Sequence, residues 1–568
     1  MFSDIVLFVI FILVLITMAL PLGTYMADVF YGENKLVGRF FLPLEKGVYR
    51  LAGVDATTEM NWRQYATALL VFNALGIGIL FIIQLMQPGL PFNPQNFGAV
   101  ESWHLALNTA ISFVTNTNWQ AYSGESTLSY FTQMAGLTVQ NFLSAATGCA
   151  VAVAFIRGLT RRTTNFIGNF WSDLVRCIVR ILLPISLVLT VFFVTQGVPQ
   201  NLDPYKTVQT VEGTQQTIAM GPVASQEAIK MLGTNGGGFF NANSAHPFEN
   251  PTPLTNFVQM LAIFLVPLAL VFMFGIVTGN KKQGFAIAGA MLLLFVVMLG
   301  TNYYSEVNGN PLVAQMNISG PTSFEGKEVR FGLGSSSLFT TVTTAASCGA
   351  VNNMHDSLTP LGGLVPLLQM MLGEVVFGGV GAGFYGIMVY VLIAVFIVGL
   401  MVGRTPEYLG KKIEAKEMKL VMLALLVPSL TILLFSAIAS VTDAGTSALN
   451  NNGPHGLSEI LYTFTSAAAN NGSAFAGITA NTLFYDLLSG LAMLLGRFGI
   501  IIPLLAVAGS MAGKKTAPVG LGTFATTSLT FMLLLVGIIL VVGALTFLPA
   551  LSLGPIVEQI VMMQGITF

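Results

Sequence analysis

Ten apolar stretches dominate the sequence, and their lengths restrict what the chain can fold into. About 20 apolar residues span a bilayer as an α-helix, and the stretches cover residues 3–22, 65–85, 131–156, 178–196, 255–278, 284–302, 365–402, 419–440, 484–511 and 525–548. Charged residues make up only 9% of the 568-residue chain, whereas soluble domains carry about 25%. The sequence therefore predicts an all-α polytopic membrane protein with about ten transmembrane helices.

The distribution of Lys and Arg predicts how these helices are oriented. Of the 24 basic residues, 19 fall in alternate loops, namely 23–64, 157–180, 279–283, 403–419 and 512–522. The opposite side holds only Lys206, Lys230, Lys327 and Arg330. Because loops rich in Lys and Arg stay in the cytoplasm, we expect both termini outside. The first stretch carries Asp4 and no basic residue at its start, which favours a retained helix over a cleavable signal peptide.

Four shorter apolar pieces are followed by uncharged stretches of small and polar residues. The pieces cover 102–115, 223–233, 335–346 and 456–469, and the polar stretches cover 113–120, 231–238, 343–351 and 466–473. The pieces are too short to cross a bilayer. They are typical of re-entrant half-helices, which occur at membrane depth only when they are buried in protein or line a water-filled path. By the charge count, all four enter from the outside.

The four polar stretches recur at a nearly constant spacing. Alignment on Asn116, Thr234, Ser347 and Asn470 separates them by 118, 113 and 123 residues. Four units of this kind can form a ring with a pseudo-fourfold axis along the membrane normal. The sequence predicts an N-terminal span with its cytoplasmic loop, four repeats and a C-terminal span, over residues 1–64, 65–176, 177–283, 284–418, 419–522 and 523–568. The alternative is a chance match among loops rich in Gly and Asn.

The aligned residues suit a dehydrated cation. Backbone carbonyls from a symmetric ring can replace the water around such an ion without fixed charge, and Gly and Asn tolerate the positive φ that such a turn favours. None of the stretches carries Asp or Glu. We therefore predict a neutral carbonyl filter for a weakly hydrated monovalent cation such as K⁺, although the pattern alone does not choose K⁺ over Na⁺. The aligned columns are Asn116, Thr234, Ser347 and Asn470; Thr117, Asn235, Cys348 and Asn471; and Asn118, Gly236, Gly349 and Gly472.

Several long segments resemble a known family. They cover residues 136–145, 221–243, 373–381, 403–410 and 470–477. They are similar to the potassium-binding A chain of the bacterial Kdp potassium-transporting ATPase, within the potassium-transporter superfamily built from four channel-like repeats. The resemblance extends almost from end to end. In this family the filter ligands come from the matching columns, with Gln120 beside the filter mouth.

The resemblance also implies a function for the whole chain. It implies a non-hydrolytic subunit in the bacterial cytoplasmic (inner) membrane that captures periplasmic K⁺. The ion would pass through an intramembrane tunnel to a P-type ATPase partner, and two smaller subunits would complete the complex. ATP and Mg²⁺ would bind only on the partner, and this chain would carry no covalent cofactor.

Two features below the expected filter bear on the path of the ion. Residues 361–402 are too long for one straight span and contain Glu374 and a glycine cluster that includes Gly378, Gly379 and Gly381. We expect a broken helix whose loop closes the straight route beneath the filter. The alternative is close helix packing through small residues.

The second feature is Arg497, which lies in the middle of a predicted span. A buried Arg is costly and is usually functional. We expect it to face the cavity below the filter, near Glu374, and to repel cations. The alternative is a structural ion pair.

Other classes of function receive less support. A run over 509–515 resembles a phosphate-binding loop but lacks its spacing and its Ser or Thr, so ATP hydrolysis is expected on another chain. The three cysteines form no CxxC pair, so they support neither a disulfide framework nor a zinc site. The chain has no basic tract that would indicate nucleic-acid binding. A free-standing four-repeat K⁺ channel or transporter stays open as an alternative. A membrane-embedded enzyme would need convergent titratable groups, and only Glu374 and Arg497 stand out.

Overall fold

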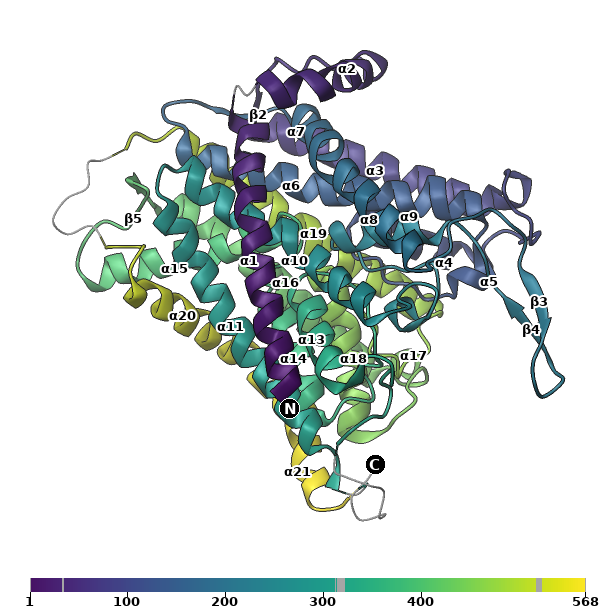
Figure 1. The fold of residues 1–568 in the computed structure, drawn as a ribbon. Coiled ribbons are helices and arrows are strands. Elements are labelled where there is room, and N and C mark those ends of the chain that lie inside the picture. Colours follow the sequence, from purple (N-terminus) through teal and green to yellow (C-terminus); the bar gives the residue numbers. More distant parts are fainter. Residues whose placement is uncertain (1, 33–34, 312, 314–321, 517–523, 567–568) are drawn as a thin grey trace.

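The fold is almost entirely helical (Figure 1). The computed structural model describes residues 2–32, 35–311, 313, 322–516 and 524–566. Within them, ten helices are long and apolar enough to cross a membrane, judged by length and composition. They are Phe2–Tyr31, Trp62–Gly89, Thr132–Thr160, Phe170–Thr195, Pro253–Val277, Lys281–Asn308, Ala382–Met401, Ala415–Val441, Leu483–Ala512 and Leu529–Met563. The prediction of about ten spans is confirmed.

The first half of the chain contains two of the predicted repeats. Its first elements are α1 (Phe2–Tyr31), α2 (Lys35–Ala52), β1 (Met60–Asn61), α3 (Trp62–Met86), α4 (Trp103–Val114), α5 (Gly124–Thr127), α6 (Val139–Thr160) and β2 (Phe166–Gly168). The next are α7 (Phe170–Cys177), α8 (Leu183–Thr195), β3 (Lys206–Gln209), β4 (Gln215–Ile218), α9 (Val223–Leu232) and α10 (Pro253–Val277). π-Helical segments precede α6 and join α7 to α8.

The second half of the chain contains the third and fourth predicted repeats. The third repeat holds α11 (Lys281–Asn308), α13 (Gly332–Ala345), α14 (Pro360–Met371), α15 (Ala382–Met401), β5 (Glu407–Tyr408) and β6 (Lys411–Lys412). Then follow α16 (Ala415–Val441), α17 (Asp443–Thr446), α18 (Gly453–Ala469), α19 (Leu483–Ala512), α20 (Leu529–Leu551) and α21 (Val557–Met563). In the described part of the chain, three small antiparallel sheets pair β1 with β2, β3 with β4 and β5 with β6. The predicted boundary at 522–523 lies outside the described residues.

The four predicted half-helices are α4, α9, α13 and α18. Each packs against a long helix of its own repeat: α4 against α3, α9 against α8, α13 against α11, and α18 against α19. Helix α19 also packs against α6 and α4, which joins the fourth repeat to the first. The repeats therefore close into a ring, while α1 lies along α10 and α20 along α11.

Burial separates an inner set of helices from an outer set. In the most apolar window of the helices that contain α6 and α10, 89% of the residues are buried, against 17% in α1 and 28% in the helix that contains α20. A helix that is apolar all round must be buried in protein or face lipid. Helices α6 and α10 therefore form part of the protein interior, and α1 and α20 present apolar faces to the surroundings.

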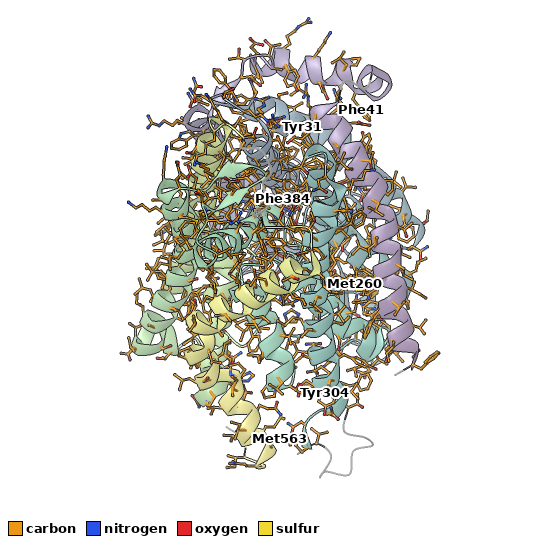
Figure 2. All side chains as sticks on the ribbon, turned by 90° about the vertical axis from the view of Figure 1, so that its left-hand side faces the viewer. Tyr31, Phe41, Met260, Tyr304, Phe384 and Met563 are labelled. Atoms are coloured by element: carbon orange, nitrogen blue, oxygen red, sulfur yellow. The ribbon has the colours of Figure 1, made fainter. Side chains whose placement is uncertain are left out.

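The two ends of the molecule differ. Tyr31 at the end of α1 and Phe41 in α2 lie at one end, whereas Tyr304 in α11 and Met563 in α21 lie at the other (Figure 2). The start of α1 lies at the same end as α21 (Figure 1). This placement agrees with both termini on one side of the membrane; which side is the cytoplasm stays a prediction.

The apolar stretch 365–402 is not one helix. Helix α14 ends at Met371 and α15 begins at Ala382. Gly373 follows the end of α14 with φ +84°, a left-handed conformation in which glycine commonly ends helices. The expected break in this helix is confirmed, and residues 372–381 form a loop inside the protein.

Candidate functional site

The four polar stretches meet at one place. We call residues 116–118, 234–236, 347–349 and 470–472 the four-segment ring. Neighbouring stretches are joined by hydrogen bonds in the order of the chain, and the fourth returns to the first. The four links are Asn116 Nδ2 to Thr234 O (2.9 Å), Gly349 N to Asn235 O (3.2 Å), Asn471 Nδ2 to Thr343 O (3.2 Å) and Asn470 Nδ2 to Thr117 Oγ1 (3.0 Å).

The first aligned column has the same backbone conformation in every repeat. All four residues are left-handed, with φ of +67°, +51°, +51° and +58° for Asn116, Thr234, Ser347 and Asn470. Asn tolerates this conformation, but Thr and Ser rarely adopt it. The same left-handed conformation at four aligned positions, two of them Thr or Ser, supports the predicted repeat alignment.

The second column shares a hydrogen bond that explains this conformation. In each repeat its amide N donates to the carbonyl five residues earlier, in the last turn of the half-helix. The pairs are Thr117 with Ser112 (2.9 Å), Asn235 with Lys230 (2.8 Å), Cys348 with Thr343 (3.2 Å) and Asn471 with Ser466 (2.9 Å). These bonds use carbonyls in the last turn of each half-helix, where the backbone lacks its usual helical donors, and they turn the chain sharply where each half-helix ends.

The third column follows the glycine prediction at three of four positions. Asn118, Gly236 and Gly472 have positive φ, whereas Gly349 does not. Gly349 is nevertheless needed for space, because an added Cβ would lie 2.8 Å from the carbonyl carbon of Gly472. At Gly236 it would lie 1.9 Å from the amide N of Gly349. These glycines therefore permit a close approach of the segments.

Amide side chains behind the ring hold it in place. Asn116 Oδ1 accepts hydrogen bonds from Asn235 Nδ2 (2.6 Å) and from Ser144 Oγ in α6 (2.8 Å). Asn118 Nδ2 donates to Asn141 Oδ1, also in α6, at 2.7 Å. These side chains are buried, and their hydrogen bonds tie the first and second ring segments to each other and to α6. The segment 136–145, singled out in the sequence, therefore includes residues that support the ring.

Gln120 lies at the edge of the ring, between the first two repeats. Its Nε2 donates to Gly238 O (3.1 Å), and its Oε1 accepts from Gly238 N (2.9 Å). Its partly buried side chain forms a two-way link to the second polar stretch.

The loop 372–381 contacts all four repeats. Glu374, buried and left-handed, accepts a hydrogen bond from Asn471 Nδ2 (2.7 Å) and contacts Ser347 Oγ. Val380 N donates to Thr234 Oγ1 at 2.9 Å. At Gly381, a Cβ would lie 1.9 Å from Gly148 O in α6.

The other glycines of this loop are equally confined. A Cβ at Gly378 would lie 2.1 Å from Cα of Gly383, and one at Gly379 would lie 2.9 Å from Cβ of Ser347. The loop therefore fits directly against the ring and α15.

Arg497 borders a small cavity next to the ring. The cavity, of about 70 Å³, is also lined by Ser347, Glu374 and Asn470. Arg497 Nη2 donates to Ser144 O at 3.0 Å, and no ion pair of Arg497 is found in the described part of the chain. Arg497 and Glu374 thus share a cavity without forming a salt bridge.

A family model supplies the comparison with known proteins. The model for the potassium-transporting ATPase A subunit matches residues 9–560. The chain belongs to this family. Three A-subunit relatives, each described as a potassium-transporting ATPase potassium-binding subunit, match almost the whole chain. Identity is 56% over 548 residues for Mesorhizobium japonicum (96% of each chain), 56% over 555 residues for Brucella anthropi (98% of each) and 58% over 553 residues for Salmonella heidelberg (97% of each).

A solved structure shares the A-subunit fold. The crystal structure of the potassium transporter TrkH from Vibrio parahaemolyticus matches with a TM-score of 0.53 at 13% identity. The match covers 89% of this chain and 98% of the TrkH chain. At this identity the likeness concerns the fold alone, and it agrees with the predicted four-repeat architecture.

A buried charge cluster that was not predicted from the sequence lies beside the ring of this A-subunit chain. Lys230, in α9, is fully buried, lies 2.7 Å from Glu227 and also contacts Glu249. The sequence places Lys230 and Lys327 with the charges of the outside loops, but Lys327 too is buried, 2.6 Å from Glu306. The three-residue spacing of Glu227 and Lys230 was the available signal; their partners farther along the chain could not be inferred.

Proposed function

We propose that this chain is the potassium-binding, channel-like subunit of an ATP-driven K⁺ uptake pump, and that the four-segment ring is its selectivity filter. The observation that carries the proposal is the convergence of four half-helices that end in the same left-handed turn. The names of the relatives, which describe potassium-binding subunits of a potassium-transporting ATPase, support the choice of ion.

The direction of the half-helices favours a cation. All four end, rather than begin, at the ring. The C-terminus of a helix carries a partial negative charge of about half an elementary charge. Four such ends stabilise a cation at the ring centre without a carboxylate, and neutral carbonyls can replace the water around a weakly hydrated ion. The twelve ring residues include no Asp or Glu, which favours K⁺ over a divalent ion.

The loop 372–381 supports a sideways route for the ion. Its contacts with all four repeats place backbone and the buried Glu374 against the ring. The charge of Arg497, which forms no salt bridge with the Glu374 that shares the adjoining cavity, repels cations from a straight exit. In the proposed mechanism the ion enters from the extracytoplasmic side of the cytoplasmic membrane and stops above this loop. It then passes through an intramembrane tunnel to a P-type ATPase subunit.

The proposal assigns ATP hydrolysis, and the ATP and Mg²⁺ it requires, to that partner. Two smaller subunits complete the proposed complex. This chain itself binds and selects the ion and is not a hydrolase.

The test is a K⁺ titration of ATPase activity in the complex purified with its operon-encoded partners. Gln120→Arg and Gly236→Asp are compared with Gln209→Arg, in the exposed strand β3, and Gly197→Asp, where a Cβ meets nothing within 4 Å. We expect both ring variants to lower the apparent affinity for K⁺ or its discrimination from Rb⁺, and both controls to behave as wild type. Unchanged affinity and selectivity in both ring variants refutes the assignment. K⁺ uptake into vesicles by this chain without partner or ATP instead establishes a free-standing transporter.

A further inference from the structure

A second cluster of ionisable side chains lies outside the ring. Asp356 precedes α14, and His455 and Glu459 lie in the first turns of α18. One ligand atom from each of these residues lies within 4.8 Å of the others. A cavity of about 270 Å³, lined by Asp356 and His455, opens beside them. The proposed filter uses none of the three.

Glu459 is the least expected member of the cluster. Its side chain is fully buried. Its Oε1 accepts a hydrogen bond from Asn451 Nδ2 at 2.7 Å, but within the described residues its Oε2 has no hydrogen-bond partner. An unsatisfied buried carboxylate oxygen is costly. A neighbour that neutralises it would remove that cost.

The two carboxylates of the cluster converge on a glycine. A Cβ at Gly477 would lie 2.1 Å from Glu459 Oε1 and 2.7 Å from Asp356 Oδ1. Because Gly477 has no side chain, the carboxylates of Glu459 and Asp356 can both approach its Cα. An oxygen of Asp356 and one of Glu459 lie within 4.8 Å of each other, and two like charges this close favour a cation beside them.

His455 is oriented as a metal ligand would be. Its Nδ1 lies 2.7 Å from Glu558 Oε1 in α21, and its Nε2 lies 2.9 Å from Asp356 Oδ1. A histidine that binds a metal usually donates its other ring N–H to a carboxylate, which fixes the tautomer and the direction of the ring. Glu558 occupies that supporting position, and Nε2 is directed at the carboxylates.

We propose that Asp356, His455 and Glu459 form a binding site for a divalent transition-metal ion of the zinc class. One imidazole nitrogen and two carboxylates, with water in the open position, are a ligand set that Zn²⁺ accepts, whereas Ca²⁺ and Mg²⁺ prefer oxygen ligands alone. The metal ion takes the place of the proton that now lies between His455 Nε2 and Asp356, and that proton goes to the solvent.

Such an ion links three parts of the chain. It joins the segment after the third polar stretch to half-helix α18, and through Glu558 it fixes α21. Asp356 N also donates to Phe475 O at 2.8 Å, just beyond ring residue Gly472. The site therefore braces the third and fourth repeats next to the ring without contacting the transported ion.

The test uses the full-length protein isolated from membranes in detergent, stripped with a chelator and titrated with Zn²⁺ by calorimetry. We expect one zinc ion per chain, a rise in melting temperature on zinc addition, and anomalous diffraction at the zinc edge beside His455. His455→Ala and the conservative Glu459→Gln should each abolish the binding and the thermal shift. His246→Ala, at a histidine that stacks on Phe240, should retain both.

Two results overturn the proposal. One is the absence of Zn²⁺ binding tighter than about 10 μM, or about 7 kcal/mol, by the wild-type chain. The other is equal zinc binding by wild type and by folded Glu459→Gln, since the ion would then lie elsewhere. Either result leaves the cluster as a network of ion pairs. Neither depends on K⁺ transport, so the proposed function can stand or fall separately.

Discussion

Substitution of Gly472 by Ala tests whether the close fit of the four-segment ring sets its affinity for K⁺. A Cβ at Gly472 would lie 1.7 Å from Thr117 O, an atom of the neighbouring repeat. Ordinary contact begins near 3.5 Å, so one segment must move by roughly 1.5–2 Å. The backbone of Gly472 also has φ +93°, which costs a residue with a Cβ about 1–2 kcal/mol.

The expected effect on binding follows from these values. If the ring relieves the strain by opening between its first and fourth segments, K⁺ must restore the closed geometry. Restoring the closed geometry makes K⁺ binding less favourable by about 1–2 kcal/mol, which weakens the apparent affinity about five- to thirtyfold. The overlap with Thr117 adds to this minimum.

Gly197→Ala is the matched control. Gly197 has φ +98°, but a Cβ there meets nothing within 4 Å. It therefore carries the same backbone strain without the overlap, and it lies after α8, away from the ring. The assay is K⁺-dependent ATPase activity of the purified complex, read as the K⁺ concentration at half-maximal rate. An unchanged value in Gly472→Ala, or an equal change in Gly197→Ala, would refute the reasoning.

Three further changes test other parts of the account. In Gly381→Ala the loop 372–381 must withdraw from α6, so we expect a higher passive K⁺ leak in vesicles; an unaltered leak removes the role of this loop in closing the straight route. Arg497→Met removes a buried positive charge, and we expect more K⁺ transported passively and less per ATP hydrolysed; intact coupling would leave Arg497 a structural role only. Lys411 lies outside the spans, and burial lowers its pKa to about 8. Its Nζ donates to the carbonyls of Gly158 (2.9 Å) and Met511 (2.8 Å), at the ends of α6 and α19. Lys411→Met removes both hydrogen bonds, while Met511 O keeps the one from Lys514 N (3.2 Å). We expect a cost of about 2 kcal/mol, measured as a fall in melting temperature in detergent at pH 7, and an unchanged temperature would contradict it.

Hydropathy and charge were sufficient to predict a ten-span helical fold, because the bilayer dictates long apolar helices whatever the details of side-chain packing. The expected half-helix 102–115 is α4 over Trp103–Val114, and 223–233 is α9 over Val223–Leu232. In each case an apolar piece too short to cross a bilayer ends at small polar residues. The break near Gly373 was also predictable, because glycine commonly ends a helix in the left-handed conformation.

The backbone of the ring was only partly predictable. Gly236 and Gly472 adopt the positive φ that their residue type favours, but Thr234 and Ser347 adopt it against theirs. A hydrogen bond from the next residue back to the half-helix holds them there. Since that bond depends on where the helix ends in space, propensity alone does not reveal it.

Long-range side-chain contacts could not be predicted from the sequence. Glu374 and Arg497 stand out because charge is rare in apolar spans, but the sequence does not indicate that Glu374 contacts Asn471 while Arg497 contacts the carbonyl of Ser144. These contacts join residues 97 and 353 positions apart. Without an alignment of related sequences, only the folded chain brings such pairs together.

The most direct test of the central claim is to locate the bound ion by anomalous diffraction from the complex prepared with Rb⁺ or Tl⁺ in place of K⁺. The account predicts a peak on the axis of the four-segment ring, coordinated by carbonyls from residues 116–118, 234–236, 347–349 and 470–472. It predicts that Gly472→Ala weakens this peak and that Gly197→Ala does not. Ordered ions found only away from these carbonyls would contradict the assignment of the ring as the filter.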